Sequence, residues 1–284
     1  MTRLQSVDIS GITSQLKAYD EELIAKTGLN LRQIACHAVE LEEETSREIA
    51  SGIKAGIVPV RWGQGVIEGF CESTAGILKY IGFDTFVTGQ SDISGLAEAY
   101  ENKADIIFLS DDNDFVALNT RTRQYVHNAE ATGKGFAAGL DLMAGGLAQQ
   151  PVLVLGCGAV GRSAALSLLH YGAAVSVYDI NSRYSREFAS SLNGYDAGRV
   201  TVERNFHNAL AGRTLIVDAT NSAEIIRAED ISPQTFIVAP GMPVGLSRRA
   251  LNKVTDRLLH DPLQIGLATM GMAVVKQILK IDRK

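Results

Sequence analysis

The stretch PVLVLGCGAVGRSAALSLLHYGAAVSVYDIN, residues 151–181, decides the fold of the second half of the chain. An apolar run at 152–155 leads into the glycine-rich turn GCGAVG at 156–161, and helical spacing then continues to about His170. A second apolar run ends in Asp179, which lies 23 residues beyond the first glycine of the turn. The segment therefore predicts a strand, a tight turn, a helix and a parallel strand that ends in an acid.

Each glycine of this turn has a separate role in a Rossmann dinucleotide-binding unit. Gly156 permits the tight turn, Gly158 lets backbone N–H groups approach a pyrophosphate, and Gly161 lets the helix pack closely on the strand. The helix that begins at Ala159 and Val160 adds a partial positive charge facing the phosphates. A cofactor site is therefore predicted, the alternative being a Rossmann unit that has lost its cofactor.

The acid at the tip of the second strand indicates which dinucleotide would bind. A carboxylate at Asp179 would hydrogen-bond both ribose hydroxyls and repel a 2′-phosphate, which favours NAD over NADP. Arg183 is the alternative acceptor of a 2′-phosphate, but it follows the end of the strand. NAD is therefore the predicted cofactor.

Two later strands are predicted to complete this site. TLIVDATN (214–221) and TFIVAPGMP (235–243) are apolar runs that end in polar or turn residues. Their carboxyl ends would flank the ribose and nicotinamide through Ala219, Thr220, Asn221 and Pro240. The segment 240–243 is equally well explained as a simple turn.

The first half of the chain predicts helices followed by a smaller α/β unit. Helical spacing covers 12–28 and 31 to about 50. Short strands then alternate with helices, the strands at 56–60, 84–89 and 105–110 and the helices at 65–82 and 94–102. Such units pair in parallel with right-handed crossovers, and ligands gather at the carboxyl ends of their strands.

The connections predict an α/β protein of two domains. After a polar stretch, 119–130, a glycine- and alanine-rich helix at 132–148 is expected to join the halves. We expect a substrate-binding helical and α/β domain at 1–148 and a Rossmann domain at 149–284. An apolar helix predicted at 263–280 would return to contact the first domain.

Composition limits the kind of protein. The 284 residues carry a net charge of −5 and are 46% hydrophobic, which suits a real core and argues against binding to nucleic acid. The three cysteines are widely spaced and form no disulfide framework or zinc motif, which favours a reducing compartment. The amino-terminal residues are polar, and no apolar run reaches the roughly 20 residues of a membrane span. We therefore expect a cytoplasmic protein without nucleic-acid or membrane partners.

Acids at a strand end are the best candidates for chemistry in the first half. The five histidines are scattered and no GxSxG or metal-ligand spacing appears, so neither a hydrolase nor a metal site is indicated. Asp111, Asp112 and Asp114 could bind a cation, face a cationic substrate or cap a helix. If the cofactor oxidises an amine, Asp111 or Asp112 could orient the ammonium and accept its proton. Asp261 is a second candidate, or the cap of the last helix.

Uncommon strings extend through nearly the whole chain. The most specific are TGLNLRQIAC (27–36), GIVPVRWGQGVI (56–67), IGFDTFVTGQSDISG (81–95) and FLSDDNDFVALN (108–119). Further strings are DATNSAE (218–224), APGMPVGLS (239–247) and DPLQIGLATM (261–270). Together they resemble the pyrrolysine synthases, the NAD-dependent dehydrogenases of pyrrolysine biosynthesis.

The resemblance implies a reaction and a substrate. The substrate would be a methylornithine joined through its carboxyl group to the side-chain amine of lysine. NAD would oxidise the carbon of its terminal primary amine with loss of ammonia, and the product would close on the remaining amine, losing water, to form a pyrroline ring. The alternatives are a two-domain dehydrogenase of the shikimate or methylene-tetrahydrofolate type, and a non-catalytic NAD-binding sensor. The Lys–Asp pair expected of a shikimate enzyme is not seen.

The resemblance also implies roles for single residues. Leu4 would lie on a first helix that closes over the substrate, Asp111 would meet the amine or the ring nitrogen, and Asn128 would hold the amino-acid end.

The chain departs from the family pattern near this site. Trp62 and Gln64 stand where Ser and Asn are expected, and both are candidate substrate contacts. Asp261 replaces an expected Glu, and His127 an expected Asn. The changes at Gln64 and Asp261 keep the chemistry but alter the reach, whereas Trp62 adds bulk.

Overall fold

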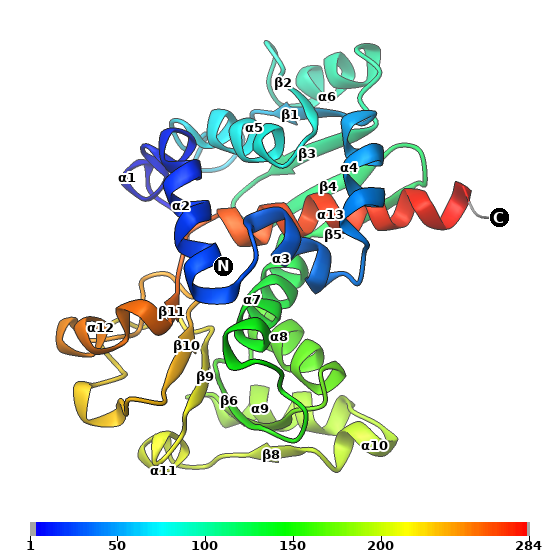
Figure 1. Ribbon diagram of the computed structural model, residues 1–284. Helices are drawn as coiled ribbons and strands as arrows, with labels where there is room; N and C mark the ends of the chain where they lie inside the picture. The colour runs from blue at the N-terminus through cyan, green and yellow to red at the C-terminus, as the bar shows by residue number, and fades with distance from the viewer. Residues whose placement is uncertain (1–3, 283–284) are drawn as a thin grey trace.

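Two sheets lie at opposite ends of the molecule, with the long helices α7 (Asn128–Ala144) and α13 (Gln264–Asp282) between them (Figure 1). The structure, a computed structural model, describes residues 4–282. Within these residues the first half contains a five-stranded sheet and the second half a six-stranded sheet. The predicted α/β class is confirmed, as are the helical beginning and the Rossmann arrangement of the second half.

Four helices precede the first sheet: α1 (Ser6–Ile9), α2 (Ile12–Thr27), α3 (Leu31–Ala38) and α4 (Glu43–Ser51). The prediction of one helix over 31–50 is wrong, because the chain turns between α3 and α4. At this turn Glu40 adopts a left-handed φ of 52°, and the Leu41 N–H donates to the Cys36 carbonyl at 2.9 Å. Neither glycine nor proline marks the break, so the sequence does not reveal it.

The first sheet has the order β2-β1-β3-β4-β5. Its strands are β1 (Lys54–Val58), β2 (Asp84–Val87), β3 (Ile106–Ser110), β4 (Phe115–Asn119) and β5 (Gln124–His127). Strand β1 pairs in parallel with β2 and β3, as predicted, with α5 (Phe70–Tyr80) and α6 (Asp92–Glu101) as crossovers. The pairs β3–β4 and β4–β5 are antiparallel.

Three predicted boundaries in this half are wrong. The polar stretch 119–130 contains β5 and the first turn of the connecting helix, neither of which was predicted there. That helix, α7 (Asn128–Ala144), begins and ends four residues earlier than predicted. The helix predicted from 65 begins at Phe70, because Gly65 and Gly69 adopt left-handed φ values of 81° and 80° and keep the preceding segment as a loop.

The second sheet is parallel throughout, in the order β11-β10-β9-β6-β7-β8. Its strands are β6 (Pro151–Leu155), β7 (Ala174–Tyr178), β8 (Val200–Val202), β9 (Leu215–Asp218), β10 (Phe236–Val238) and β11 (Leu258–Leu259). The sequence predicts four of them and misses β8 and β11, which span only three and two residues. The helices of this half are α8 (Ala159–His170), α9 (Ser182–Ser191), α10 (Gly194–Ala197), α11 (Phe206–Leu210) and α12 (Arg248–Val254), with 3-10 turns at η1 (Ala228–Asp230) and η2 (Thr255–Arg257).

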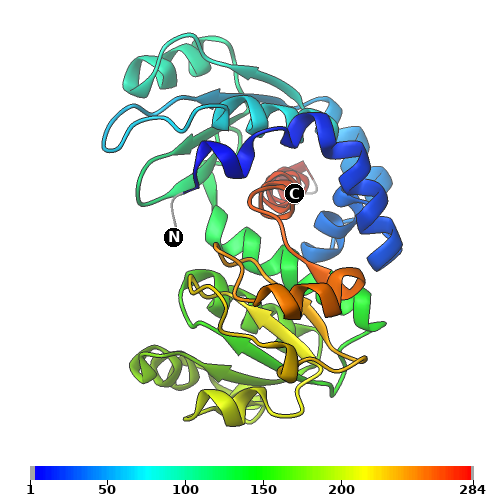
Figure 2. The ribbon, with the colours of Figure 1, turned by 90° about the vertical axis from the view of Figure 1, so that its left-hand side faces the viewer.

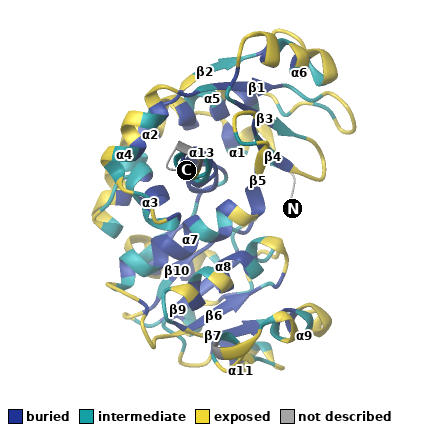
Figure 3. Ribbon diagram, turned by 90° about the vertical axis from the view of Figure 1, so that its right-hand side faces the viewer, coloured by how far each residue is buried: buried dark blue, intermediate teal, exposed yellow. Residues whose placement is uncertain are grey.

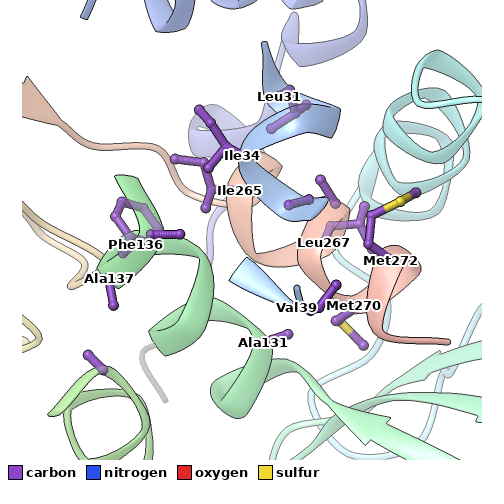
Figure 4. Packing of buried hydrophobic residues seen from close by; sticks show 14 of the residues in the cluster. Leu31, Ile34, Val39, Ala131, Phe136, Ala137, Ile265, Leu267, Met270 and Met272 are labelled. Carbon is purple, nitrogen blue, oxygen red and sulfur yellow. The ribbon is translucent and has the colours of Figure 1, made fainter. Parts of the chain in front are cut away.

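The last helix, α13 (Gln264–Asp282), returns to the first half, as predicted. It is seen end-on in Figure 2, inside the first half, where it packs against α3, α4, α5, β4, β5 and α7. Figure 4 shows Ile34 of α3, Phe136 of α7 and Ile265 of α13 grouped in this core. All three are at most 1% exposed, and burial of one such side chain stabilises the fold by about 2 kcal/mol.

The connecting helix α7 is close-packed on both sides. A Cβ on Gly133 would lie 2.5 Å from the Val160 carbonyl oxygen of α8, and one on Gly135 would lie 2.5 Å from Thr269 Oγ1 of α13. These glycines explain the small-residue pattern of the helix. Figure 3 shows α7 as largely buried, whereas α6 and α9 are exposed over much of their length. In the part of the chain that the structure describes, no helix has the length and apolar character that crossing a membrane requires.

Candidate active site

The glycine-rich turn after β6 is shaped by contacts that leave no room for side chains. Gly156 has a φ of 87°, and a Cβ there would lie 2.7 Å from the Ala219 carbonyl oxygen. A Cβ on Gly161 would overlap the carbonyl oxygen of Gly156. Both glycines are therefore required by the protein's own backbone.

The middle glycine is different. Gly158 has an ordinary backbone conformation, and a Cβ there would meet no protein atom within 4 Å. It precedes α8 as its N-cap, where no side chain supplies a capping hydrogen bond. Gly158 and Ala159 are exposed and Val160 is half-buried. An open glycine beside uncapped helical N–H groups fits a pyrophosphate, which needs close backbone approach and hydrogen-bond donors.

Asp179 follows the end of β7 and is fixed against the turn. Its Oδ2 accepts from the Cys157 N–H at 2.7 Å, and its Oδ1 accepts from the Asn181 N–H at 2.8 Å. The side chain is half-buried, and each carboxylate oxygen can accept more than one hydrogen bond. The ionised group therefore keeps acceptor capacity for a ribose beside the glycine turn.

The loops after β9 and β10 converge on the same turn. The Ala219 N–H donates to the Leu155 carbonyl at 2.9 Å, and a Cβ on Gly241 would overlap the Thr220 carbonyl oxygen. Thr220 and Pro240 are half-buried here, and Asn221 is exposed. The four residues assigned to the ribose and nicotinamide thus stand on loops that meet the glycine turn.

A buried acid that the sequence analysis did not single out holds these loops together. Asp218 is fully buried; its Oδ1 accepts from the Thr220 hydroxyl at 2.7 Å and its Oδ2 from the Gly245 N–H at 2.9 Å. Burial raises the pKa of this carboxyl, and the Thr220 and Gly245 hydrogen bonds partly offset that rise. Its position as the last residue of an apolar strand was the available signal.

In the first half, Asp111 shapes the tight turn between β3 and β4. Its Oδ1 accepts from the N–H groups of Asn113 and Asp114, both at 2.8 Å, and its own N–H donates to the Asp114 carbonyl at 2.9 Å. The hydrogen bonds from Asp114 and Asn113 lower the pKa of the Asp111 carboxyl. Asp111 is therefore an exposed carboxylate at neutral pH, and it does not cap a helix.

A small apolar cavity opens beside Asp111, at the carboxyl ends of β1 and β3. Asp111 and Ser110 are the polar residues at its edge, and aromatic and aliphatic side chains, including Phe70, Phe108 and Phe115, form the walls. An open depression that Leu4 lines continues from it, because Val66 and Ile67 line both. Leu4 and Asp111 therefore lie on two hollows that share a wall, and their contacts with a substrate stay predictions.

A chain of contacts links this region to the glycine turn. His127 Nδ1 accepts from the Ala129 N–H at 3.1 Å, so its Nε2–H donates to Asp114 Oδ1 at 2.7 Å. One turn further along α7, the Glu130 carbonyl accepts from the Ser163 hydroxyl of α8 at 2.7 Å. The turn at 111–114, called the Asp111 turn, and the turn at 156–161, called the glycine turn, therefore adjoin the same end of α7.

Asn128 lies at that end of α7 and is buried. Its Nδ2 lies 3.4 Å from Met270 Sδ, and its Oδ1 accepts from the Thr132 hydroxyl at 3.4 Å. Sulfur is a weak acceptor and both contacts are long, so the amide retains hydrogen-bonding capacity.

Comparison with known proteins places the chain in a family. It is 32% identical to pyrrolysine synthase of Methanosarcina acetivorans over 97% of this chain and all of that protein. The chain belongs to the pyrrolysine synthase family. The pyrrolysine synthase of Methanosarcina barkeri is also 32% identical, over 97% of this chain and 98% of that protein. The resemblance inferred from the short strings is confirmed.

Family and fold descriptions agree with this assignment. "Pyrrolysine biosynthesis protein PylD, N-terminal domain" matches residues 8–126, and "Alanine dehydrogenase/PNT, C-terminal domain" matches residues 125–232. Shikimate dehydrogenase of Aquifex aeolicus has a similar fold, with a TM-score of 0.54, 16% identity and coverage of 79% of this chain and 91% of that chain. Quinate dehydrogenase of Corynebacterium glutamicum gives a TM-score of 0.52 at 13% identity, covering 80% of this chain and 99% of that one. This pyrrolysine synthase family member therefore has a dehydrogenase-type fold.

Two of the candidate substrate contacts, at positions where the chain departs from the family pattern, do not line the Asp111 cavity. Trp62 is 85% exposed on the loop after β1, and Gln64 is also exposed. The loop itself is held down, because Asp92 Oδ1 accepts from the Arg61 N–H at 2.8 Å and Asp112 Oδ2 accepts from the Gln64 N–H at 2.9 Å. Asp112 is thus a loop anchor, and substrate contacts of Trp62 and Gln64 stay predictions.

Asp261 takes the capping role that the sequence also allowed. It is 4% exposed; its Oδ1 accepts from the Leu263 N–H at 3.0 Å, and its Oδ2 accepts from the Tyr19 hydroxyl at 2.6 Å. Burial raises the pKa of Asp261, with the Tyr19 hydrogen bond acting in the opposite direction. It lies at the start of α13 and not among the residues that line the Asp111 cavity. Within residues 4–282, no three His, Cys, Asp or Glu side chains are grouped to hold a metal ion.

Proposed function

We propose that the protein oxidises the terminal primary amine of a methylornithyl-lysine conjugate with NAD, releasing ammonia and closing the pyrroline ring of pyrrolysine. Family membership over 97% of the chain supports the pathway. The observation that carries the proposal is the placement of anionic Asp111 beside an apolar cavity, at the same end of α7 as the glycine turn. An anion, an apolar wall and a dinucleotide site are what a cationic, aliphatic substrate of a dehydrogenase requires.

We propose that the glycine turn holds the cofactor. Backbone N–H groups at Gly158, Ala159 and Val160 would face the pyrophosphate, and Asp179 would accept from the ribose hydroxyls. The loops carrying Ala219, Thr220, Asn221 and Pro240 would flank the ribose and nicotinamide. Bound there, NAD supplies an acceptor for the hydride.

Asp111 would act on the substrate's terminal ammonium. Its carboxylate orients the ammonium through a charge-assisted hydrogen bond and accepts a proton, so that the nitrogen lone pair can assist departure of the hydride from the adjacent carbon. The lowered pKa of Asp111 keeps its carboxyl group anionic at neutral pH. Because Asp111 is exposed, that proton passes on to water.

The remaining steps need little from the protein. The oxidised carbon, now an iminium, takes up water and loses ammonia to give an aldehyde. The remaining amine attacks this aldehyde and water leaves, which closes the ring. Leu4 would cover the site, Asn128 would bind the amino-acid end of the substrate, and Trp62 and Gln64 would adjust the fit from the loop after β1, whereas Asp261 acts as the cap of α13.

The test is direct. Protein, NAD and the lysine–methylornithine conjugate are incubated, and the products are followed by mass spectrometry and by NADH absorbance. We expect one NADH for each conjugate consumed and a product lighter by ammonia and two hydrogens. Binding of NAD without turnover would favour a sensor, and turnover of shikimate or of methylene-tetrahydrofolate in place of the conjugate would favour those dehydrogenase types.

A further inference from the structure

Two arginines lie close to the acid assigned to the cofactor's ribose. Arg162 stands on the first turn of α8, and its Nε donates to the Cys157 carbonyl at 2.8 Å. The N–H of the same Cys157 donates to Asp179 Oδ2 at 2.7 Å. Arg183 stands on the first turn of α9, four residues after Asp179 in the chain. If Asp179 faces the ribose, both arginines stand on the two helices that begin beside it, where a 2′-phosphate would project.

One carboxylate engages both arginines. Glu187 Oε1 accepts from Arg183 Nε at 2.6 Å, and Glu187 Oε2 lies 3.7 Å from Arg162 Nη2. Arg162 Nη2 also donates to the Tyr184 carbonyl at 3.4 Å, which fixes the guanidinium along α9. The hydrogen bond from Arg183 lowers the pKa of Glu187, so the carboxylate is ionised at neutral pH.

Arginine near this ribose is what a Rossmann unit needs to accept NADP, because a guanidinium pairs well with a phosphate dianion. Arg183 is 76% exposed and could turn toward such a phosphate if it were released from Glu187. The attraction of Arg183 for the 2′-phosphate would then offset the repulsion by Asp179.

We propose that Glu187 is a second determinant of cofactor choice, which acts by holding Arg183 away from a 2′-phosphate, while Arg162 stays fixed by the Cys157 and Tyr184 carbonyls. This role rests on the proposed cofactor site. The preference for NAD would then depend on two acids. Asp179 would face the ribose, and Glu187 would pair with the arginines beside it.

The test compares binding, not turnover. NADH and NADPH are titrated by fluorescence into the native protein, Glu187→Gln, and Glu187→Gln combined with Arg183→Ala. Adenosine 5′-phosphate and adenosine 2′,5′-bisphosphate serve as competitors, because they report the adenosine end alone. Glu229→Gln is the matched control. Glu229 is also an exposed acid near an arginine, Arg227, but it belongs to the connection between β9 and β10, whereas Glu187 belongs to the connection between β7 and β8.

We expect Glu187→Gln to tighten NADPH by about 5-fold, the size of one exposed ion pair, with NADH little changed. Adenosine 2′,5′-bisphosphate should gain equally, and Arg183→Ala should reverse the gain. An unchanged NADPH-to-NADH ratio, an equal shift in Glu229→Gln, or a gain that survives Arg183→Ala would overturn the role of Glu187 while leaving the cofactor site intact. If native protein bound neither dinucleotide, the cofactor site would fall, and the role of Glu187 with it.

Discussion

The Asp111 turn and the glycine turn both follow parallel strands, yet they are built by opposite means. The glycine turn depends on missing side chains, because Gly156 and Gly161 touch backbone that a Cβ would displace. The Asp111 turn depends on a side chain, whose Oδ1 takes the place of a backbone acceptor for two N–H groups. Sterics restrict the first turn to glycine, whereas several polar residues could form the second. A motif therefore identifies the first turn, and only a family resemblance identifies the second.

The largest effect is expected from Asp111→Asn. An amide oxygen can still accept from Asn113 and Asp114, so the turn should persist while the charge is lost. Turnover at neutral pH should fall by about 10²–10⁴-fold, the usual contribution of a positioned base. Part of the loss should return at high pH, where more of the substrate amine is already neutral. NADH affinity, measured by fluorescence, should not change.

Asp112→Asn is the matched control for this prediction. It removes the same charge from the adjacent residue, which anchors the loop at Gln64. Its effect on turnover should be much smaller. Native turnover in Asp111→Asn at pH 7 would mean that Asp111 only shapes the turn.

The glycine turn can be broken selectively at Gly158. A Cβ there meets no protein atom within 4 Å and the position needs no unusual backbone, so the melting temperature of Gly158→Val should stay near the native value. NADH affinity should fall by about 100-fold or more, since each lost charge-assisted hydrogen bond to a pyrophosphate contributes about 1.5–3 kcal/mol.

Gly161→Ala should give the opposite result. Its Cβ overlaps the Gly156 carbonyl oxygen, so the free energy of unfolding should drop by about 1–3 kcal/mol. NADH titration and thermal unfolding of Gly158→Val and Gly161→Ala check both predictions. Unchanged NADH affinity in Gly158→Val would show that this loop holds no dinucleotide.

A smaller change is expected from Asp179→Asn, which keeps one acceptor oxygen beside Cys157. Loss of the charge removes the repulsion of a 2′-phosphate and weakens the ribose hydrogen bonds. The preference for NADH over NADPH should narrow by about 10-fold, a typical value for hydrogen bonds to a charged group. Parallel fluorescence titrations measure it, and equal affinity of the native protein for both would refute the assignment of Asp179.

The smallest effect on turnover and cofactor binding should come from Tyr19→Phe, because Tyr19 lies away from both turns. Loss of the hydroxyl deprives buried Asp261 of one partner and should lower the free energy of unfolding by about 1–3 kcal/mol, with NADH affinity unchanged. Burial holds the pKa of Asp261 above its unfolded value, so its contribution to stability declines as pH rises through the folded pKa. Removing Tyr19 raises that pKa further, so the destabilisation should be greater at pH 8 than at pH 5.

Urea unfolding at the two pH values checks this, with Tyr80→Phe as the control. Tyr80 donates to Asp20 Oδ2 at 2.8 Å on the surface, so its loss should change stability by less than about 0.5 kcal/mol. An equal effect of both variants would show that the buried pair is not special.

The sequence predicted those features that rest on local pattern. The strand–turn–helix of 151–181 follows from glycine sterics and period-2 or helical spacing, and the structure agrees closely. The break at Glu40 and the strand β5 could not be foreseen, because each depends on packing against α7 and α13, elements distant in the chain. Asp218 and the link through His127 were missed for the same reason, since their partners come from other loops. Leu4 and Asn128 came from the resemblance, because nothing in their local sequence marks them.

The glycines of α7 also bear on how this fold could change in length. One residue added between Gly133 and Gly139 would rotate everything after it by about 100°, so one group of glycines would no longer face its partners on α8, α13 or β11. The angle between the two sheets would then change, and with it the distance between the Asp111 turn and the glycine turn. The loop at 145–150, which includes exposed glycines with left-handed backbones, has no such constraint. Insertions should therefore be found in that loop and be absent from the helix, although the two segments are adjacent in the chain.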